Sequence, residues 1–117
     1  QRLGQRGEAL ARSHLEDRGH AVLETNYRTG SGEIDLVTQK DGVLVFIEVR
    51  TKRGGGFGPP DESVTRDKRS RLVACAQKYL EATDAGEVEW RIDVLAIQMD
   101  SRGKLLRLEV IQNAVEL

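Results

Sequence analysis

The sequence predicts an α/β protein in which helices pack on a mixed five-stranded sheet. Two segments of the 117-residue chain have the apolar spacing of amphipathic helices, and five have the composition of strands. The second helical segment falls between the third and fourth strands, where its length allows a parallel crossover, whereas short turns let the first three strands pair directly. The expected order is therefore α-β-β-β-α-β-β.

The first predicted element is a helix over residues 3–18. Ala11 and Leu15 are four residues apart on its apolar stripe, and Gly19 provides a stop signal. A short strand is expected over residues 21–27, because its β-branched, aromatic and apolar side chains are followed by turn-forming residues from position 28 to 32.

A hairpin follows this turn. Strands are expected over residues 33–38 and 43–51, joined at Asp41-Gly42, because Asp-Gly sequences favour tight turns between strands. The register of such a hairpin places Asp35 opposite residue 48 or 49, so Asp35 and Glu48 become neighbours. Side-chain alternation also predicts that residues 33, 35 and 37 face one way and residues 34 and 36 the other.

The second half of the chain contains the longer helix. Residues 54–60 (GGGFGPP) favour an irregular loop, and the helix is expected from Ser63 onward, with Ser63 or Thr65 as its cap. Strands are expected over residues 90–97 and 104–111. Because the length suits one domain and no linker is apparent, residues 1–117 are expected to form a single domain.

Composition excludes several classes of protein. The longest apolar run has five residues, far fewer than the roughly 20 that cross a bilayer. A lone Cys75 cannot form an internal disulfide, so a reducing, cytoplasmic location is expected. The net charge of −1 gives no global argument for nucleic-acid binding, but positions 50–71 hold seven basic and three acidic residues. Candidates for phosphate contacts in this segment are Lys52, Arg53, Arg66 and Lys68.

Two carboxylates in apolar strands are the main sign of a functional site. If Asp35 and Glu48 face each other, they repel and lose hydration, which destabilises the fold unless a cation lies between them. Mg²⁺ suits such a place because it prefers oxygen ligands. The residues alone leave three interpretations open: a structural ion cluster with Arg50, a metal site, or a binding surface.

Several other polar or aromatic residues have simpler explanations. Asp93 is expected to be a structural hydrogen-bond acceptor at the entry of its strand. Cys75 is expected to pack in the core, and Tyr79 and Trp90 in the core or at a strand edge. The two histidines lack the spacing of zinc ligands.

The ordered motifs of the chain resemble a known family. They include Gly7-Glu8, GEIDLV at residues 32–37, VFIEVRTK at residues 45–52 and RIDV at residues 91–94. Together they resemble the YraN-like family of predicted bacterial endonucleases. That family belongs to the restriction-endonuclease-like PD-(D/E)xK superfamily and is related to archaeal Holliday-junction resolvases. The resemblance implies a restriction-endonuclease-like core that hydrolyses phosphodiester bonds, with branched DNA as substrate and a homodimer as the active form.

The resemblance also implies the residues of the site. Mg²⁺ or Mn²⁺ would be held by Glu8, Asp35, Glu48 and the backbone carbonyl of Val49. Arg50 stands where the superfamily most often has Lys, and it joins the three acids as a candidate catalytic residue. Lys52 and Lys68 are alternative sources of an ammonium group. Two rival functions remain open: a nuclease-fold nucleic-acid-binding module with weak or no activity, and an interaction protein whose acidic cluster is structural.

Overall fold

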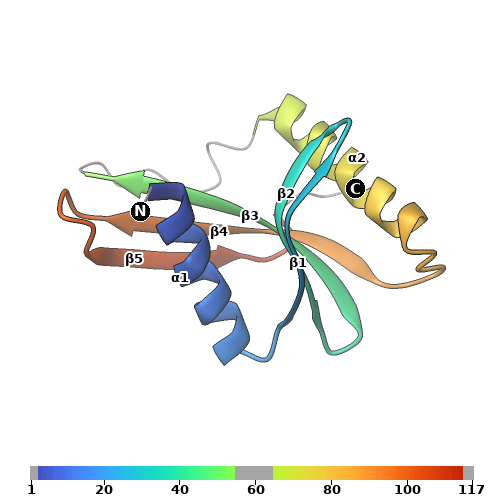
Figure 1. Ribbon diagram of the computed structural model, residues 1–117, viewed down its shortest axis with the longest axis horizontal. Coiled ribbons are helices and arrows are strands. Elements are labelled where there is room, and N and C mark those ends of the chain that lie inside the picture. The colour runs from blue at the N-terminus through green and yellow to red at the C-terminus, as the bar shows by residue number, and fades with distance from the viewer. Residues whose placement is uncertain (1–2, 55–64, 115–117) are drawn as a thin grey trace.

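The computed structural model describes residues 3–54 and 65–114 (Figure 1). The helices are α1 (Leu3–Asp17) and α2 (Arg66–Ala82). The strands are β1 (Ala21–Thr29), β2 (Gly32–Lys40), β3 (Val43–Arg53), β4 (Trp90–Met99) and β5 (Leu105–Ile111). The α/β class and the order α-β-β-β-α-β-β agree with the sequence prediction. Within these two ranges, neither helix has the length and apolarity needed to span a membrane.

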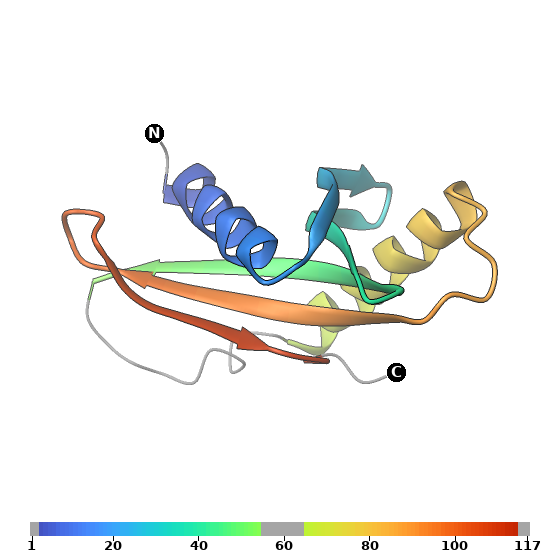
Figure 2. The same cartoon turned by 90° about the horizontal axis from the view of Figure 1, so that it is seen from below.

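The five strands form one mixed sheet in the order β1-β2-β3-β4-β5. β3 and β4 are parallel because α2 connects them as a crossover, whereas the other neighbouring strands are antiparallel. Figure 2 shows α1 lying along one face of the long strands, while β1 and β2 turn away from the plane of β3 and β4. This divergence opens the sheet between β2 and β3.

Each helix covers its own apolar core on one face of the sheet. The core cluster under α1 includes Ala11, Leu15, Val45 and Ile47. The core cluster under α2 includes Leu44, Phe46, Leu72 and Ala76. Successive residues of β3 thus alternate between the two clusters, as expected for a central strand that is buried on both faces.

The predicted packing roles of three residues are confirmed. Cys75 is fully buried in the cluster under α2. The Tyr79 ring meets Tyr27 and Phe46 edge-on, with centroid distances of 5.2 and 5.6 Å, and Phe46 meets Trp90 at 5.8 Å. Such perpendicular arrangements suit the charge distribution of aromatic rings. These aromatic side chains therefore pack against one another and stabilise the fold.

The first hairpin is tighter than the sequence suggested. β1 continues to Thr29 and β2 begins at Gly32, so the turn expected over residues 28–32 contains only residues 30 and 31. Thr29 pairs directly with Gly32, and a two-residue turn is sufficient to reverse the chain between such partners.

The start of α2 is fixed by a side-chain cap. Thr65 has extended backbone angles, and its hydroxyl accepts the backbone N–H of Lys68 at 3.2 Å. The expectation that Thr65 caps this helix is confirmed. The alternative cap at Ser63 and residues 55–60 of the predicted glycine-rich loop lie outside the described residues.

Removal of this cap should destabilise the protein moderately. We expect Thr65→Ala to lower the free energy of unfolding by about 1 kcal/mol, because one N–H group of the first turn loses its acceptor. Thr65→Ser keeps the hydroxyl and should stay within a few tenths of a kcal/mol of the original protein. Urea unfolding of both variants measures the difference, and equal stability of Thr65→Ala and the original protein would contradict a capping role.

Candidate functional site

Asp35 lies where β2 and β3 separate. The ladder between these strands ends at the pair Leu36 and Ile47, so the predicted register is correct and would next bring Asp35 opposite Glu48. Instead of continuing the ladder, the Asp35 carboxylate accepts the backbone N–H of Val49 at 2.7 Å. The side chain thus occupies the opening between the strands, next to an edge of β3 that β2 has left.

The predicted alternation of side chains along β2 is wrong at this point. Ile34 packs in the cluster under α2 together with Val37, whereas Leu36 packs under α1. The register of β1 places Asn26 opposite Asp35, and Asn26 has a left-handed backbone with φ of +49°. This irregular position, combined with the separation of β2 from β3, changes the direction of the side chains on either side of Asp35.

Glu48 is a buried carboxylate on the face of the sheet that α2 covers. Its exposed fraction is 8%, and its Oε1 atom lies 3.3 Å from the ammonium group of Lys68. Lys68 lies in the first turn of α2, where the Thr65 cap holds the helix start in place. Because a buried charge requires a partner, this ion pair explains how Glu48 is tolerated inside the sheet.

The environment of Asp35 favours its protonated form. Burial raises the pKa of Asp35 to about 7, and the nearby carboxylates of Glu48 and Glu8 act in the same direction, while the Val49 N–H group opposes them. Burial, more than the neighbouring charges, therefore opposes the ionisation of Asp35 near neutral pH. A cation bound beside Asp35 would stabilise its ionised form.

Glu8 approaches the same region from α1. Its Oε2 atom accepts a hydrogen bond of 2.6 Å from the side-chain amide of Asn26, and its charge acts on Asp35. In the described parts of the chain, however, no three His, Cys, Asp or Glu side chains are placed together closely enough to hold a metal ion. The structure thus brings Asp35 and Glu48 together and places Glu8 nearby, with its carboxylate directed to Asn26.

A pocket of about 220 Å³ opens over the acidic pair. It lies between the start of β2, β3 and the first turns of α2, and its lining residues are Gly32, Glu33, Asp35, Glu48, Lys68, Arg71 and Leu72. One wall carries carboxylates and the other carries Lys68 and Arg71. This combination can accept a divalent cation on one side and a phosphate group on the other.

The basic residues expected at the site have different positions. Lys68 contacts Glu48 of the acidic pair, although the sequence favoured Arg50. Arg50 is partly buried further along β3, and among the described residues it makes no ion pair with a carboxylate. The side chains of Lys52, Arg53 and Arg66 are exposed. Whether any of these residues contacts a substrate stays a prediction.

Sequence reasoning missed two residues of this region. Arg71 lines the pocket because it follows Lys68 by three positions on the same side of α2, and this spacing could have revealed it. Asn26 holds Glu8, and its presence inside a predicted strand was a usable signal, because Asn is rare in strands and tolerates left-handed backbone angles.

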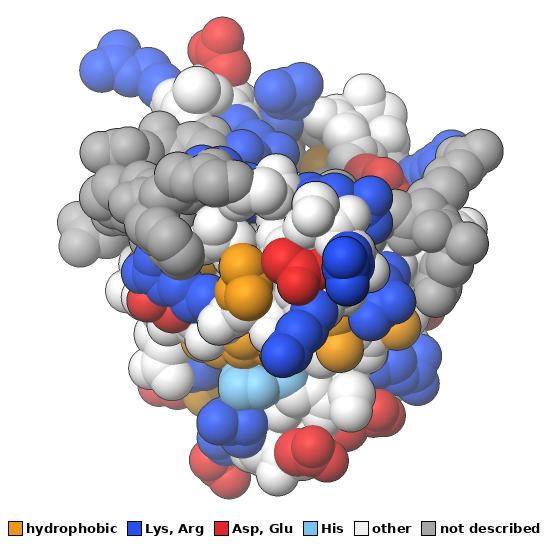
Figure 3. Space-filling view, turned by 90° about the vertical axis from the view of Figure 1, so that its left-hand side faces the viewer, with side chains coloured by type: hydrophobic (Ala, Val, Ile, Leu, Met, Phe, Trp, Pro, Cys, Tyr) orange, Lys and Arg blue, Asp and Glu red, His pale blue; other side chains and the backbone are white. Residues whose placement is uncertain are grey.

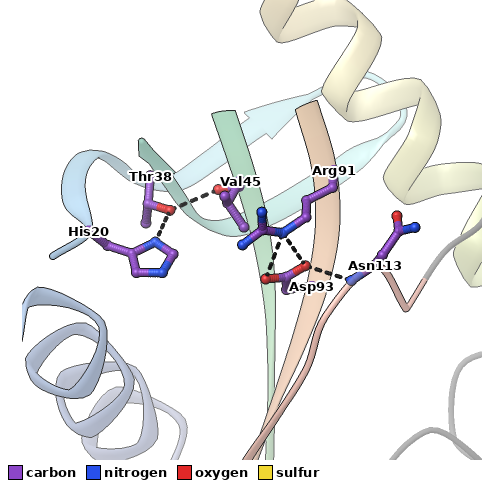
Figure 4. Close-up of polar contacts among 6 residues, drawn as sticks. All are labelled: His20, Thr38, Val45, Arg91, Asp93 and Asn113. Carbon is purple, nitrogen blue, oxygen red and sulfur yellow. Dashed lines mark hydrogen bonds and ion pairs between the residues drawn. The ribbon is translucent and has the colours of Figure 1, made fainter. Parts of the chain in front are cut away.

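Asp93 has the structural role that the sequence suggested. Figure 4 shows its carboxylate between the Arg91 side chain and the backbone near Asn113. It accepts hydrogen bonds from Arg91 Nε at 3.1 Å and from the Asn113 N–H group at 2.8 Å. These contacts satisfy a carboxylate that is 1% exposed, and they tie the segment after β5 to β4.

His20 is also engaged in a buried structural contact. The Thr38 hydroxyl donates to the Val45 carbonyl at 3.1 Å and therefore accepts from His20 Nδ1 at 2.9 Å (Figure 4). Burial lowers the pKa of His20, and the positive charges of Lys40 and Arg91 add to this effect. His20 is therefore a neutral core residue near neutral pH.

The fold and this pocket define an α/β protein with a buried acidic pair beside a basic helix start. The chain belongs to the uncharacterised protein family UPF0102, and the match covers residues 7–97. This is the YraN-like family that the ordered motifs resemble.

Relatives of the same family match over nearly the whole chain. A UPF0102 protein of Roseiflexus castenholzii is 47% identical over 98% of this chain and 94% of its own length. A UPF0102 protein of Symbiobacterium thermophilum is 42% identical over 97% of this chain and 95% of its own length. Among solved structures, Pyrococcus furiosus SfsA in complex with Ca²⁺ is similar at a TM-score of 0.37 and 11% identity, covering 97% of this chain and 64% of SfsA. A likeness of that size supports no conclusion about function.

Proposed function

We propose that the protein is a metal-dependent endonuclease that hydrolyses phosphodiester bonds in DNA. The observation that carries this proposal is the Asp35 and Glu48 pair, buried at the opening between β2 and β3, where burial and carboxylate neighbours raise the pKa of Asp35 to about 7. Strongly perturbed carboxylates in a pocket are characteristic of functional sites. The basic wall of the same pocket suits a phosphodiester substrate.

The donor atoms of the site fit Mg²⁺ or Mn²⁺. All of them are oxygens, which these hard cations prefer, and the carboxylates of Asp35, Glu48 and Glu8 would hold the ion, with Glu8 exchanging its bond to Asn26 for the ion. The Val49 carbonyl is a fourth candidate, because N–H and C=O of one strand residue point to the same side and the Val49 N–H points to Asp35. The ion would supply an activated water and offset negative charge on the phosphate.

The chain's own basic residues would bind and orient the substrate. Lys68 and Arg71 line the pocket and can contact the phosphate next to the cleaved bond. Arg50 lies two residues after Glu48 on the same strand and is the next candidate for such a contact. Lys52 and Arg66 would extend the basic surface. By analogy with resolvases, we propose branched DNA as substrate, a homodimer as the active form and the cytoplasm as the location.

Lys68→Ala offers a direct test of the site. In the metal-free protein Lys68 pairs with Glu48, so it competes with a cation for that carboxylate. We expect Lys68→Ala to bind Mn²⁺ several-fold more tightly in calorimetric titrations. We also expect it to cleave labelled DNA about tenfold more slowly, because a phosphate contact is lost. Lys78→Ala, an exposed change in the same helix, is the matched control and should alter neither quantity.

Failure of the intact protein would overturn the proposal. If neither Mg²⁺ nor Mn²⁺ supports cleavage of linear, branched or single-stranded DNA above the rate in EDTA, the protein is not such an enzyme. The second candidate is then a nucleic-acid-binding module without chemistry. It is favoured by the engagement of Glu48 with Lys68 and of Glu8 with Asn26, and it requires DNA binding that is indifferent to metal.

A further inference from the structure

Two arginines converge on the turn between β4 and β5. A Cβ atom placed on Gly103 would lie 3.7 Å from the Cζ and Nη1 atoms of Arg6 and 3.8 Å from Nη2 of Arg53. One guanidinium group comes from α1 and the other from the end of β3, and both lie next to Gly103. Gly103 is buried beneath them with φ of +84°, a conformation that glycine adopts without strain.

Neither guanidinium has an acidic partner among the described residues. The carboxylate of this turn belongs to Asp100, which accepts the backbone N–H groups of Arg102 and Lys104 at 2.8 Å each. Asp100 is thus engaged by its own turn, and the side chains of Arg102 and Lys104 add positive charge. Figure 3 views this end of the sheet and shows more Lys and Arg than acidic side chains in the middle of the face.

This basic cluster is separate from the acidic pocket. Positions 6 and 8 are about 200° apart around an α-helix, so they lie on opposite sides of α1. Gly7 between them faces Thr51 of β3, Glu8 is directed to β1, and Arg6 is directed to the turn after β4. Arg53 is the last residue of β3, five positions after Glu48, so the two arginines lie near the end of this strand and away from the residues that line the acidic pocket.

We propose that Arg6 and Arg53 form a second phosphate-binding point, which holds a nucleic-acid backbone outside the acidic pocket. Guanidinium groups bind phosphate oxygens through paired N–H donors, and an anion between the two groups relieves their mutual repulsion. Contacts of this kind add affinity without reading sequence. The inference goes beyond the proposed hydrolysis, because binding here requires neither a metal nor the acidic residues.

The test measures binding of a labelled DNA duplex by fluorescence anisotropy in EDTA, at salt concentrations from about 50 to 200 mM. We expect Arg6→Gln combined with Arg53→Gln to weaken binding about tenfold and to reduce the slope of log K against log salt by about 1 to 2. Replacement of both arginines by Lys keeps the charge and should retain most of the slope. Arg12→Gln, which removes an α1 arginine paired with Glu16, is the matched control and should have little effect.

Three outcomes would overturn the proposal. The first is a double Gln variant, shown to be folded by urea unfolding, that binds DNA like the Arg12→Gln control. The second is displacement of the duplex by polyglutamate as effectively as by unlabelled DNA of equal charge, which would assign the arginines to an acidic protein partner. The third is displacement of the labelled duplex by inorganic phosphate as effectively as by unlabelled DNA, at equal concentrations of phosphate groups. That result would assign the two arginines to free phosphate. Cleavage is not measured, so an inactive acidic pocket would leave these outcomes unchanged.

Discussion

Replacement of Asp35 by Asn is expected to abolish metal-dependent cleavage and, at the same time, to stabilise the metal-free protein at pH 8. Both effects originate from one carboxylate that is buried and has like charges nearby. Asp35 is a proposed metal ligand, and its loss should reduce the cleavage rate by at least about 100-fold, since even changes behind the ligands often cost 10- to 100-fold. The neutral amide avoids the cost of burying a charge and the smaller repulsion by Glu48 and Glu8, and it can still accept the Val49 N–H bond.

The pH dependence of the stability effect has a defined sign. Asp35 has an ordinary pKa of 3.8 and a pKa of about 7 in the folded protein, so folding opposes its ionisation. The destabilisation begins above pH 3.8, grows as pH rises and is complete above pH 7. The shift corresponds to at most about 4 kcal/mol, and partial exposure to solvent reduces the expected gain from Asn to about 1 to 3 kcal/mol at pH 8. Near pH 4 the gain should vanish.

Urea unfolding of Asp35→Asn and the original protein at pH 4, 6 and 8 measures this effect, with a chelator present. Asp41→Asn is a suitable control, because Asp41 is an exposed turn residue and Asn tolerates its φ of +52°. Addition of Mn²⁺ at pH 8 should stabilise the original protein more than Asp35→Asn. If Asp35→Asn is less stable than the original protein at pH 8, the account of a strained acidic pair is wrong.

The sequence predicted the position of the acidic pair because its signals are local. Asp41-Gly42 fixes the turn, the turn fixes the register of β2 and β3, and the register brings Asp35 next to Glu48. The hairpin register did not predict that the ladder between β2 and β3 ends at Leu36. The ladder ends there because β2 diverges from β3, and this divergence depends on the tertiary packing of both strands. The Asp35 bond to the Val49 N–H group exists only because β2 has already left β3.

The basic partner of Glu48 also could not be predicted from local sequence signals. Arg50 is close to Glu48 in sequence, and a pattern read along one strand favours it. Lys68 is twenty positions away and reaches Glu48 because the crossover helix begins beneath β3 and is capped by Thr65. A contact between separate elements depends on the path of the chain between them, which local spacing does not specify.

Gly7→Ala is expected to destabilise the protein by about 2 to 3 kcal/mol, although alanine is the better helix former by about 1 kcal/mol. The new Cβ atom would lie 2.2 Å from Thr51 Oγ1, 3.2 Å from its Cγ2 and 3.3 Å from its Cβ. Rotation of Thr51 cannot relieve every contact, so α1 must move away from β3. Because Glu8 follows Gly7 directly, this movement should also disturb its bond to Asn26.

A second substitution separates this clash from other effects of the change. Thr51→Ala removes the two closest atoms and leaves only the Cβ contact at 3.3 Å, so Gly7→Ala in that background should cost less than about 1 kcal/mol, giving a coupling free energy of about 2 kcal/mol. Ser13→Ala, an exposed change in the same helix, controls for helix propensity and should raise stability by only a few tenths of a kcal/mol. Urea unfolding of the four proteins in the cycle measures the coupling. A Gly7→Ala protein as stable as the original would show that α1 does not need this close approach. In the double variant, stability and DNA cleavage are compared with those of Gly7→Ala alone. If both recover together, the packing of α1 on β3 determines the position of Glu8.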